Sequence, residues 1–259
     1  MSYEQMQNNQ VYLSGQIASA PEFSHEIMGE KFYDTTVSVE RLSGQSDVIP
    51  ITVSDRLMEG QNFEIGNLIG LIGQFRSYNK IVDGKSKLVL RVFVRELCEC
   101  DENAPNVIEL EGYVCKPPVY RTTPFKREIA DLLIAVNRAY NKSDYIPAIA
   151  WGRNARYAST FDVGDKIHLV GRIQSRIYQK SLDDGTIEER VAYEVSITKF
   201  ETIQNRLIER IALSKPFRIL VMYVMYIRRV YGRAFSRSSS QSGGFAFSLS
   251  KSEEEEFEL

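Results

Sequence analysis

The chain repeats one pattern of residues at a spacing of about one hundred positions, and this repeat constrains its fold more than any other feature. A shift of 97 residues superposes Gly15, Arg41, Ser46, Asp47, Ile49 and Pro50 on Gly112, Arg138, Ser143, Asp144, Ile146 and Pro147. After one inserted residue, a shift of 98 superposes Ile65, Gly66 and Gly73 on Val163, Gly164 and Gly171. A period this long suits a small globular domain rather than a solenoid unit. The sequence therefore predicts two copies of one domain, over residues 8–101 and 106–205, and a tail over residues 206–259.

Each copy has the pattern of β-strands separated by polar turns. In the first copy, five β-rich runs are bounded by Gly, Asn, Asp and Ser, and they cover residues 11–18, 32–41, 47–53, 68–78 and 88–97. Short non-strand segments follow the third strand, at residues 55–59 and, with helical character, at residues 153–161. Five strands with a helix after the third is the order of the OB fold, a Greek-key barrel whose open face commonly holds oligonucleotides. The predicted class is all-β, with two tandem OB-fold (five-stranded Greek-key) barrels, each with a short helix, and a partly flexible C-terminal tail; other small barrels remain alternatives.

Charge is divided unevenly between the copies. Residues 1–105 hold 9 Lys and Arg against 15 Asp and Glu, whereas residues 106–205 hold 14 against 13. Under the repeat, Tyr145 corresponds to Val48 and Trp151 corresponds to Ser54. The second copy is therefore predicted to be the main nucleic-acid binder, and the first a weaker binder or a scaffold.

Composition excludes several function classes. The three cysteines are odd in number and lack the paired spacing of a zinc site, so a reduced cytoplasmic setting with no metal or cofactor is expected. The N-terminus lacks the features of a secretory signal, and no run reaches the roughly 18 apolar residues of a membrane span. With only His25 and His168, and no Walker loop or nucleophile elbow, no residues can be assigned catalytic roles, and an enzyme is not expected.

Aromatic and basic side chains are predicted to share an exposed face in the second copy. Strand alternation places Tyr145, Ile149 and Trp151 on one face of their strand, opposite the core face. The strand that follows is expected to neighbour it in the barrel and to repeat the arrangement. Ile173 and Ile177 point one way, as on the core face, and the other face carries Arg172, Gln174, Arg176 and Tyr178. Rings that stack on bases, beside cations that neutralise phosphates, are what non-specific single-strand binding requires. The alternative is that Trp151 is an ordinary core residue.

Further candidate DNA contacts lie outside these two strands. A basic loop with an aromatic residue, expected between the first two strands, contributes Arg121, Phe125, Lys126 and Arg127, although a plain charged turn would have the same composition. Backbone contacts are also expected from Arg138, Arg153 and Arg156. In the first copy, Arg76, Tyr78 and Lys80 share a parity, and Phe23, Phe32 and Tyr33 are candidates to line a face.

The sequence resembles the bacterial single-stranded DNA-binding proteins, in particular a Firmicutes-type form with two OB domains in one chain. The segments NQVYLSGQ, GQFRSYN, EGYVCKPPVYRTTPF, REIADLLIAVNRAYNKSDYIPAIAWGRNARYA and VGDKIHLVGRIQSR carry the resemblance. The resemblance implies passive coating of single-stranded DNA in replication, repair and recombination, with Tyr145, Trp151 and Tyr178 at the positions of the family's stacking aromatics. It also implies four OB domains in the working unit, so that this chain would form a homodimer.

The tail departs from that family's pattern. Its end is acidic with an apolar tip but lacks proline, and the expected partner-binding residues are Glu255, Glu256, Phe257, Glu258 and Leu259. Residues 236–244 are rich in Ser and Gly and are predicted to form a flexible tether. Residues 211–231 are apolar with basic flanks and are expected to pack on the OB domains; lying on a membrane surface and contacting DNA are the alternatives. The alternative functions are a primosomal replication-restart or RNA-binding OB protein, and a protein-interaction adaptor that uses the acidic terminus.

Overall fold

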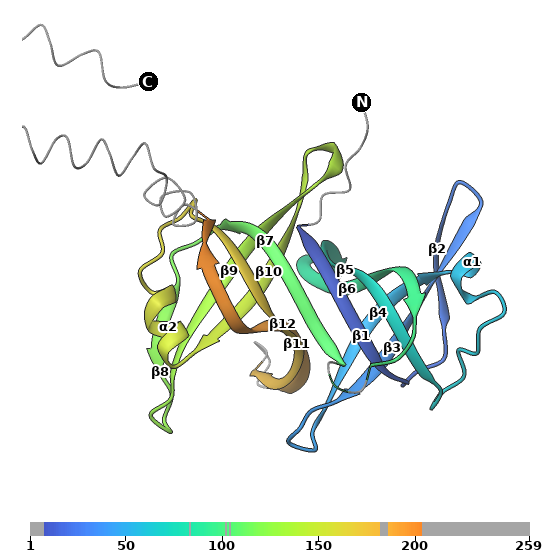
Figure 1. The fold of residues 1–259 in the computed structure, drawn as a ribbon, viewed down its shortest axis with the longest axis horizontal. Coiled ribbons are helices and arrows are strands. Elements are labelled where there is room, and N and C mark those ends of the chain that lie inside the picture. The colour runs from blue at the N-terminus through green and yellow to red at the C-terminus, as the bar shows by residue number, and fades with distance from the viewer. Residues whose placement is uncertain (1–7, 83, 102, 104, 182–185, 204–259) are drawn as a thin grey trace, which may run out of the picture. The chain divides into compact units, whose positions relative to one another are not determined.

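Mostly antiparallel β-strands form the greater part of the described chain (Figure 1). The computed structural model describes residues 8–82, 84–101, 103, 105–181 and 186–203. The first copy contains β1 (Asn9–Ile17), β2 (Glu22–Ile27), β3 (Glu30–Glu40), β4 (Ser46–Ser54), α1 (Asp55–Met58), β5 (Leu68–Val82) and β6 (Lys85–Cys98). The second contains β7 (Asn106–Val114), β8 (Val119–Thr122), β9 (Glu128–Arg138), the 3₁₀ turn η1 (Ala139–Asn141), β10 (Lys142–Trp151), α2 (Arg153–Ala158), β11 (Lys166–Ser181) and β12 (Ile187–Thr202).

Each copy closes a five-stranded barrel. In the first copy β1 pairs with β3 and β5, β3 with β4, and β5 with β6, all antiparallel, while β4 pairs with β6 in parallel. The strands β7, β9, β10, β11 and β12 repeat this pattern. Apolar side chains from alternate positions fill both interiors, as in β1, where Val11 and Leu13 are fully buried. The predicted class, two tandem OB-fold barrels, is confirmed.

Two strands lie outside the predicted set of five per copy. Both β2 and β8 form the outer strand of a hairpin, with β3 and β9 respectively, and they are the two edges of the sheet. Every residue of β2 and β8 is exposed. Because neither strand has a buried face, neither shows the alternation of apolar and polar residues by which a strand is recognised in a sequence.

The recurring glycines lie where two strands of a barrel approach each other too closely for any side chain. A Cβ atom at Gly15 would lie 2.3 Å from the carbonyl oxygen of Ser38, and one at its counterpart Gly112 would lie 2.5 Å from that of Ala135. The pair Gly73 and Gly171 would meet backbone oxygens at 2.5 and 2.3 Å, next to irregularities in the strand register. Only glycine fits these positions, which explains why they recur at the repeat spacing.

The two barrels are joined by a strand pairing across the repeat. β1 and β7 lie side by side and antiparallel, from Asn9 opposite Leu110 to Leu13 opposite Asn106, so the sheet continues from one copy into the other (Figure 1). The described residues of both copies belong to one compact unit. The domain boundaries at 8–101 and 106–205 therefore remain predictions, and those made for residues 206–259 lie outside the described residues.

A buried carboxylate reinforces this joint. Asp47, on β4, is 1% exposed and accepts hydrogen bonds from Arg41 of its own copy, one of them from Nε at 2.7 Å. From the other copy it accepts the Ser175 backbone N–H at 2.7 Å and the Arg172 guanidinium at 3.2 Å. In addition, Ser175 Oγ accepts the backbone N–H of Val48 at 3.3 Å. The acidic side chain thus binds both copies at once.

We call this arrangement, a buried Asp of one copy bound to a Ser of the other, a clasp. The repeat produces a second clasp around Asp144, with weaker partners. Asp144 is fully buried and accepts the backbone N–H of Ser77 at 2.7 Å, and Ser77 Oγ accepts the backbone N–H of Tyr145 at 2.7 Å. Arg138 Nε lies 3.5 Å from Asp144 Oδ2, an oxygen that has no hydrogen-bond partner. The counterpart of Arg172 is Gln74 in the first copy, which supplies no charge. Burial therefore outweighs these partners and raises the pKa of the Asp144 carboxyl above its ordinary value.

Removing the well-partnered clasp should destabilise the protein far more than removing an exposed ion pair. We expect Asp47→Ala to lower the free energy of unfolding by about 3–5 kcal/mol, because two guanidinium groups lose their buried counterion. The control is Asp131→Ala, which removes the partner of Arg121 on the protein surface, at 2.8 Å, and should cost at most about 1 kcal/mol. Urea unfolding of both variants measures the difference, and equal losses would contradict the role given to Asp47.

The second clasp predicts a pH dependence of stability. Because the folded pKa of Asp144 is raised, the folded protein holds this proton more tightly than the unfolded chain does. The stability that Asp144 contributes is therefore complete below the unfolded pKa of about 3.9 and is lost as pH rises through the folded pKa. Relative to Asp144→Asn, the wild-type protein should be most favoured in acid and less favoured towards neutral pH. Urea unfolding from about pH 3 to 7 tests this; a difference that grows with pH would have the wrong sign.

Candidate nucleic-acid interface

β10 presents two large rings on the surface of the second barrel. Tyr145 is 48% exposed and Trp151 is 40% exposed, whereas Ile146 and Ala150 are fully buried. The two rings have the same parity and lie six residues apart, which is about 20 Å along a strand. The alternation is not perfect, because Ile149 was expected on the exposed face and is only 5% exposed.

Trp151 lies where the strand turns into a helix. It is the last residue of β10, and Gly152 follows with φ 54° and ψ −122°, a conformation that only glycine adopts readily. α2 then begins at Arg153, whose side chain is exposed. Across the sheet, Trp151 pairs with Ile129 of β9, and Ile129 pairs with Arg121 of β8. The indole is therefore level with the last strand pairs of the β8–β9 hairpin before its turn.

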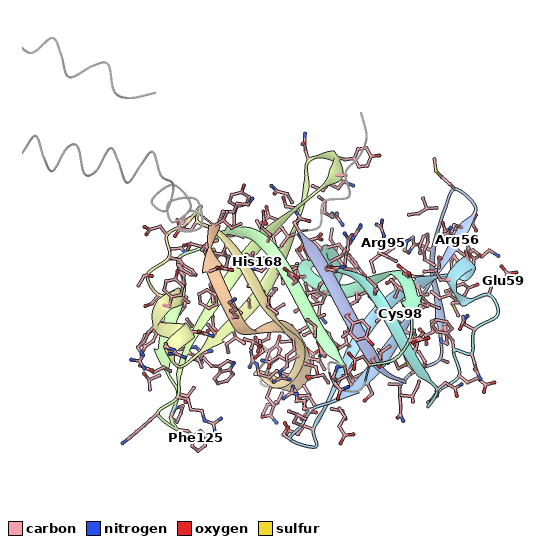
Figure 2. All side chains as sticks on the ribbon, viewed as in Figure 1. Arg56, Glu59, Arg95, Cys98, Phe125 and His168 are labelled. Atoms are coloured by element: carbon pink, nitrogen blue, oxygen red, sulfur yellow. The ribbon has the colours of Figure 1, made fainter. Side chains whose placement is uncertain are left out.

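That hairpin carries the basic run of the second copy. The sequence predicted a loop here, and the structure forms a tight β-hairpin closed by hydrogen bonds between Thr123 and the backbone of Lys126 and Arg127. Phe125 is 87% exposed at the outer end of this hairpin (Figure 2). Among the described residues, Lys126, Arg127 and Arg153 have no ion-pair partner, so their charges are available to a ligand.

Four other predicted arginines are already paired with carboxylates. Arg172 and Arg138 face Asp47 and Asp144 in the clasps, so the structure places them in the joint between the copies. On the surface, Arg121 pairs with Asp131 at 2.8 Å, and Arg156 pairs with Glu128 at 3.0 Å. A phosphate would have to displace these carboxylates to bind them.

The predicted face on β11 is only partly formed. Gln174 is 7% exposed and donates a hydrogen bond to Glu194 at 2.7 Å, whereas Ile177, expected in the core, is 69% exposed. The placement of Ile177 was wrong because β11 and β12 continue as a hairpin, and Ile177 is not among the residues that pack into a core. The expectation that this strand adjoins β10 was also wrong, since β12 lies between them in the sheet.

Tyr178 and Arg176 remain exposed on this hairpin. The Tyr178 side chain is 36% exposed, and the Arg176 guanidinium carbon lies 5.8 Å from the centre of its ring. Arg176 is 57% exposed and only loosely paired with Glu194, at 3.7 Å. A guanidinium over a phenol ring is a cation–π contact that leaves the other face of the ring free for a base.

In the first copy, the three residues predicted to contact DNA differ in exposure. They are Arg76, Tyr78 and Lys80. Arg76 lies over the ring of Phe93, 4.9 Å from its centre, and burial, followed by the nearby charge of Arg138, lowers the pKa of its guanidinium. Tyr78 is 47% exposed, and Lys80 is exposed. Arg76 therefore supports the aromatic surface, and the other two side chains reach solvent.

An aromatic row accompanies this surface, and two of its members were missed in the sequence. The ring of His25 stacks on that of Phe32 at 4.9 Å, and Phe32 packs against Phe93 at 5.6 Å. At the side of this row, Phe23 contacts Tyr33 edge-on at 6.1 Å. His25 could have been found only by recognising β2 as a strand, because its pairing with β3 brings His25 beside Phe32. Phe93 lies on β6, within a run that was predicted to be a strand, and was overlooked there.

Two further kinds of feature, a metal site and a membrane-spanning helix, are not found among the described residues. In this part of the chain, no three His, Cys, Asp or Glu side chains are grouped closely enough to hold a metal ion. No helix within the same residues is long and apolar enough to cross a membrane.

Comparison with known proteins agrees with this geometry. The sequence model of the single-strand binding protein family matches residues 105–203, the second barrel. A single-stranded DNA-binding protein of Clostridium tetani is 31% identical over 110 residues, which cover 39% of this chain and 74% of that protein. A single-stranded DNA-binding protein of Thermus thermophilus is 23% identical over 213 residues, covering 71% of this chain and 81% of that protein.

A solved structure has the same fold over both barrels. The wild-type single-stranded DNA-binding protein of Thermus aquaticus covers 75% of this chain and 92% of its own, with a TM-score of 0.56 and 23% identity. The fold agreement spans the two tandem barrels, and the sequence agreement with the clostridial relative covers most of that relative's length. This chain belongs to the single-strand binding protein family.

Proposed function

We propose that this chain binds single-stranded DNA without sequence specificity and without catalysis, by stacking bases on aromatic rings and neutralising phosphates with Lys and Arg. The observation that carries the proposal is the register of the second barrel, which places Trp151 level with the β8–β9 hairpin and next to Arg153. Stacking rings and unpaired cations are thus adjacent on one surface, and every base has a face on which a ring can stack.

The role of such binding in the cell follows from the family. Its relatives are named single-stranded DNA-binding proteins, and the corresponding role here is to coat DNA strands in the cytoplasm during replication, repair and recombination. The proposed DNA contacts of the second copy are Tyr145, Trp151, Phe125, Lys126, Arg127, Arg153, Arg176 and Tyr178.

The second copy carries most of the affinity in this proposal. Val48 and Ser54 replace its two β10 rings in the first copy, and Ser54 is buried. The first copy extends the binding surface through Tyr78, Lys80 and the aromatic row around Phe32. A homodimer would place four barrels on one DNA strand, and the terminal residues 255–259 are the proposed hook for replication or repair proteins, outside the described residues.

Loss of the indole should weaken binding to every sequence equally. We expect Trp151→Ala to reduce affinity by about 1–3 kcal/mol, the range measured for one stacked base. Trp151→Phe, which keeps a smaller ring, should lose less. Fluorescence anisotropy of labelled oligonucleotides of mixed and uniform sequence measures both variants, and quenching of Trp151, the only tryptophan, provides an independent check in the wild-type protein. Unchanged emission at saturation would contradict direct stacking.

The hairpin cations should set part of the salt dependence. Each phosphate contact on single-stranded DNA contributes about 0.7 to the slope of log affinity against log salt concentration. The double variant Lys126→Ala/Arg127→Ala should therefore lower the slope by about 1.4 if each side chain contacts one phosphate. Arg121→Ala/Arg156→Ala is the matched double control, and it should change the slope less because Arg121 is paired with Asp131 and Arg156 with Glu128. Equal changes in slope for both variants would show that pairing with a carboxylate does not decide which cations contact phosphate.

A further inference from the structure

A groove of about 820 Å³ runs between two long hairpins that belong to different copies. One wall comes from β6 of the β5–β6 hairpin and the other from β12 and Tyr178 of the β11–β12 hairpin. Pro50 and Pro147, which occupy the same position in the two copies, both line it. The groove therefore lies at the joint of the repeat, and its volume is that of a ligand site, about 300–1,000 Å³.

The lining of this groove suits flat, polar rings. Tyr178 and Tyr193 contribute aromatic surface from the second copy, and the prolines add apolar surface. From the first copy, Ser19 and Thr36 also line it, and the Thr36 hydroxyl donates a hydrogen bond to that of Ser19 at 2.9 Å. Such a mixture of rings and hydrogen-bonding groups is characteristic of sites that bind a ligand by stacking and by its polar edge.

The charges of the groove disfavour phosphate. Two of its cations are already paired with carboxylates that also line it: Arg91 with Asp34 at 3.1 Å, and Arg190 with Glu188 at 2.6 Å. Glu22 and Glu189 line the groove as well, and among the residues that the structure describes they have no ion-pair partner. The remaining cation of the lining, Lys87, also has no ion-pair partner among these residues, so two unpaired carboxylates stand against one unpaired cation. Unpaired carboxylates repel phosphate and accept hydrogen bonds from amino groups, such as the exocyclic amine of cytosine.

We infer that this groove takes bases, and not phosphates, of a single DNA strand that passes from one copy to the other, and that Glu22 and Glu189 favour bases with an exocyclic amino group. The inference rests on the proposed function and adds to it a second site, built from both copies. Tyr178 then serves the groove and not the β10 face with which the sequence grouped it. The consequence is a modest base preference in a protein whose other contacts are indifferent to sequence.

The test compares oligo-dC with oligo-dT of equal length. The double variant Glu22→Gln/Glu189→Gln should lower the dC-to-dT affinity ratio about fivefold, the lower end for losing one base-specific contact, while the salt slope stays unchanged. Intrinsic differences in strand flexibility cancel, because the same two oligonucleotides are used throughout. Glu59→Gln/Glu64→Gln is the control for net charge, since both side chains are exposed, Glu59 beside α1 (Figure 2), and neither lines the groove; it should leave the ratio unchanged. Tyr178→Ala should weaken both oligonucleotides about fivefold or more through loss of stacking.

Two results would overturn the inference. If the double Gln variant binds dC and dT more tightly by the same factor, with a steeper salt slope, the groove holds phosphates. If neither this variant nor Tyr178→Ala changes binding, no strand enters the groove. In both cases quenching of Trp151 by DNA would persist, which separates failure of this inference from failure of the proposed function, where no oligonucleotide would bind.

Discussion

The buried carboxylate of Asp47 is the interaction on which the arrangement of the two barrels depends. A charge this deeply buried is tolerated only because it is bound from both sides, by Arg41 of its own copy and by Arg172 and Ser175 of the other. The hydrogen bonds of Asp47 to Arg172 and Ser175 require particular distances and angles, so they fix how β4 lies against β11. The strand pairing of β1 with β7 joins the copies, and the clasps set their orientation.

That orientation determines what the surfaces can bind. The Asp47 clasp holds β11, through Ser175, against the first copy. The Asp144 clasp holds β5, through Ser77, against the second copy. Each long hairpin therefore begins in one copy and lies beside the other. A groove with walls from both copies exists for this reason, and rigid placement of its rings before DNA arrives limits the entropy cost of binding.

The sequence alone predicted the repeat, the barrel class and the exposure of Tyr145 and Trp151, because each of these leaves a local pattern. Glycines at Gly15 and Gly112 recur where backbones nearly touch, and alternation on β10 separates core from surface. Other features leave no such pattern. The edge strand β2 has no buried face, and the parity of Ile177 predicts burial only while its strand still borders a core. A clasp residue such as Arg172 cannot be told from a surface arginine in the sequence, because its partner Asp47 lies in the other copy.

The differences between the copies follow from the same joint. Duplication alone would give two equal clasps, but Arg172 is matched by Gln74. Asp47 accepts hydrogen bonds from two cations, Arg41 and Arg172, whereas Arg138 lies 3.5 Å from Asp144 and Arg76 acts on it only through its charge. The copies also differ on the outside, where Tyr145 and Trp151 stand opposite Val48 and Ser54. Once two barrels are held in fixed orientation, only one of them needs to keep every stacking ring, because a strand bound by one is delivered to the other. The absence of these two rings from the first copy is then compatible with a function that both copies share.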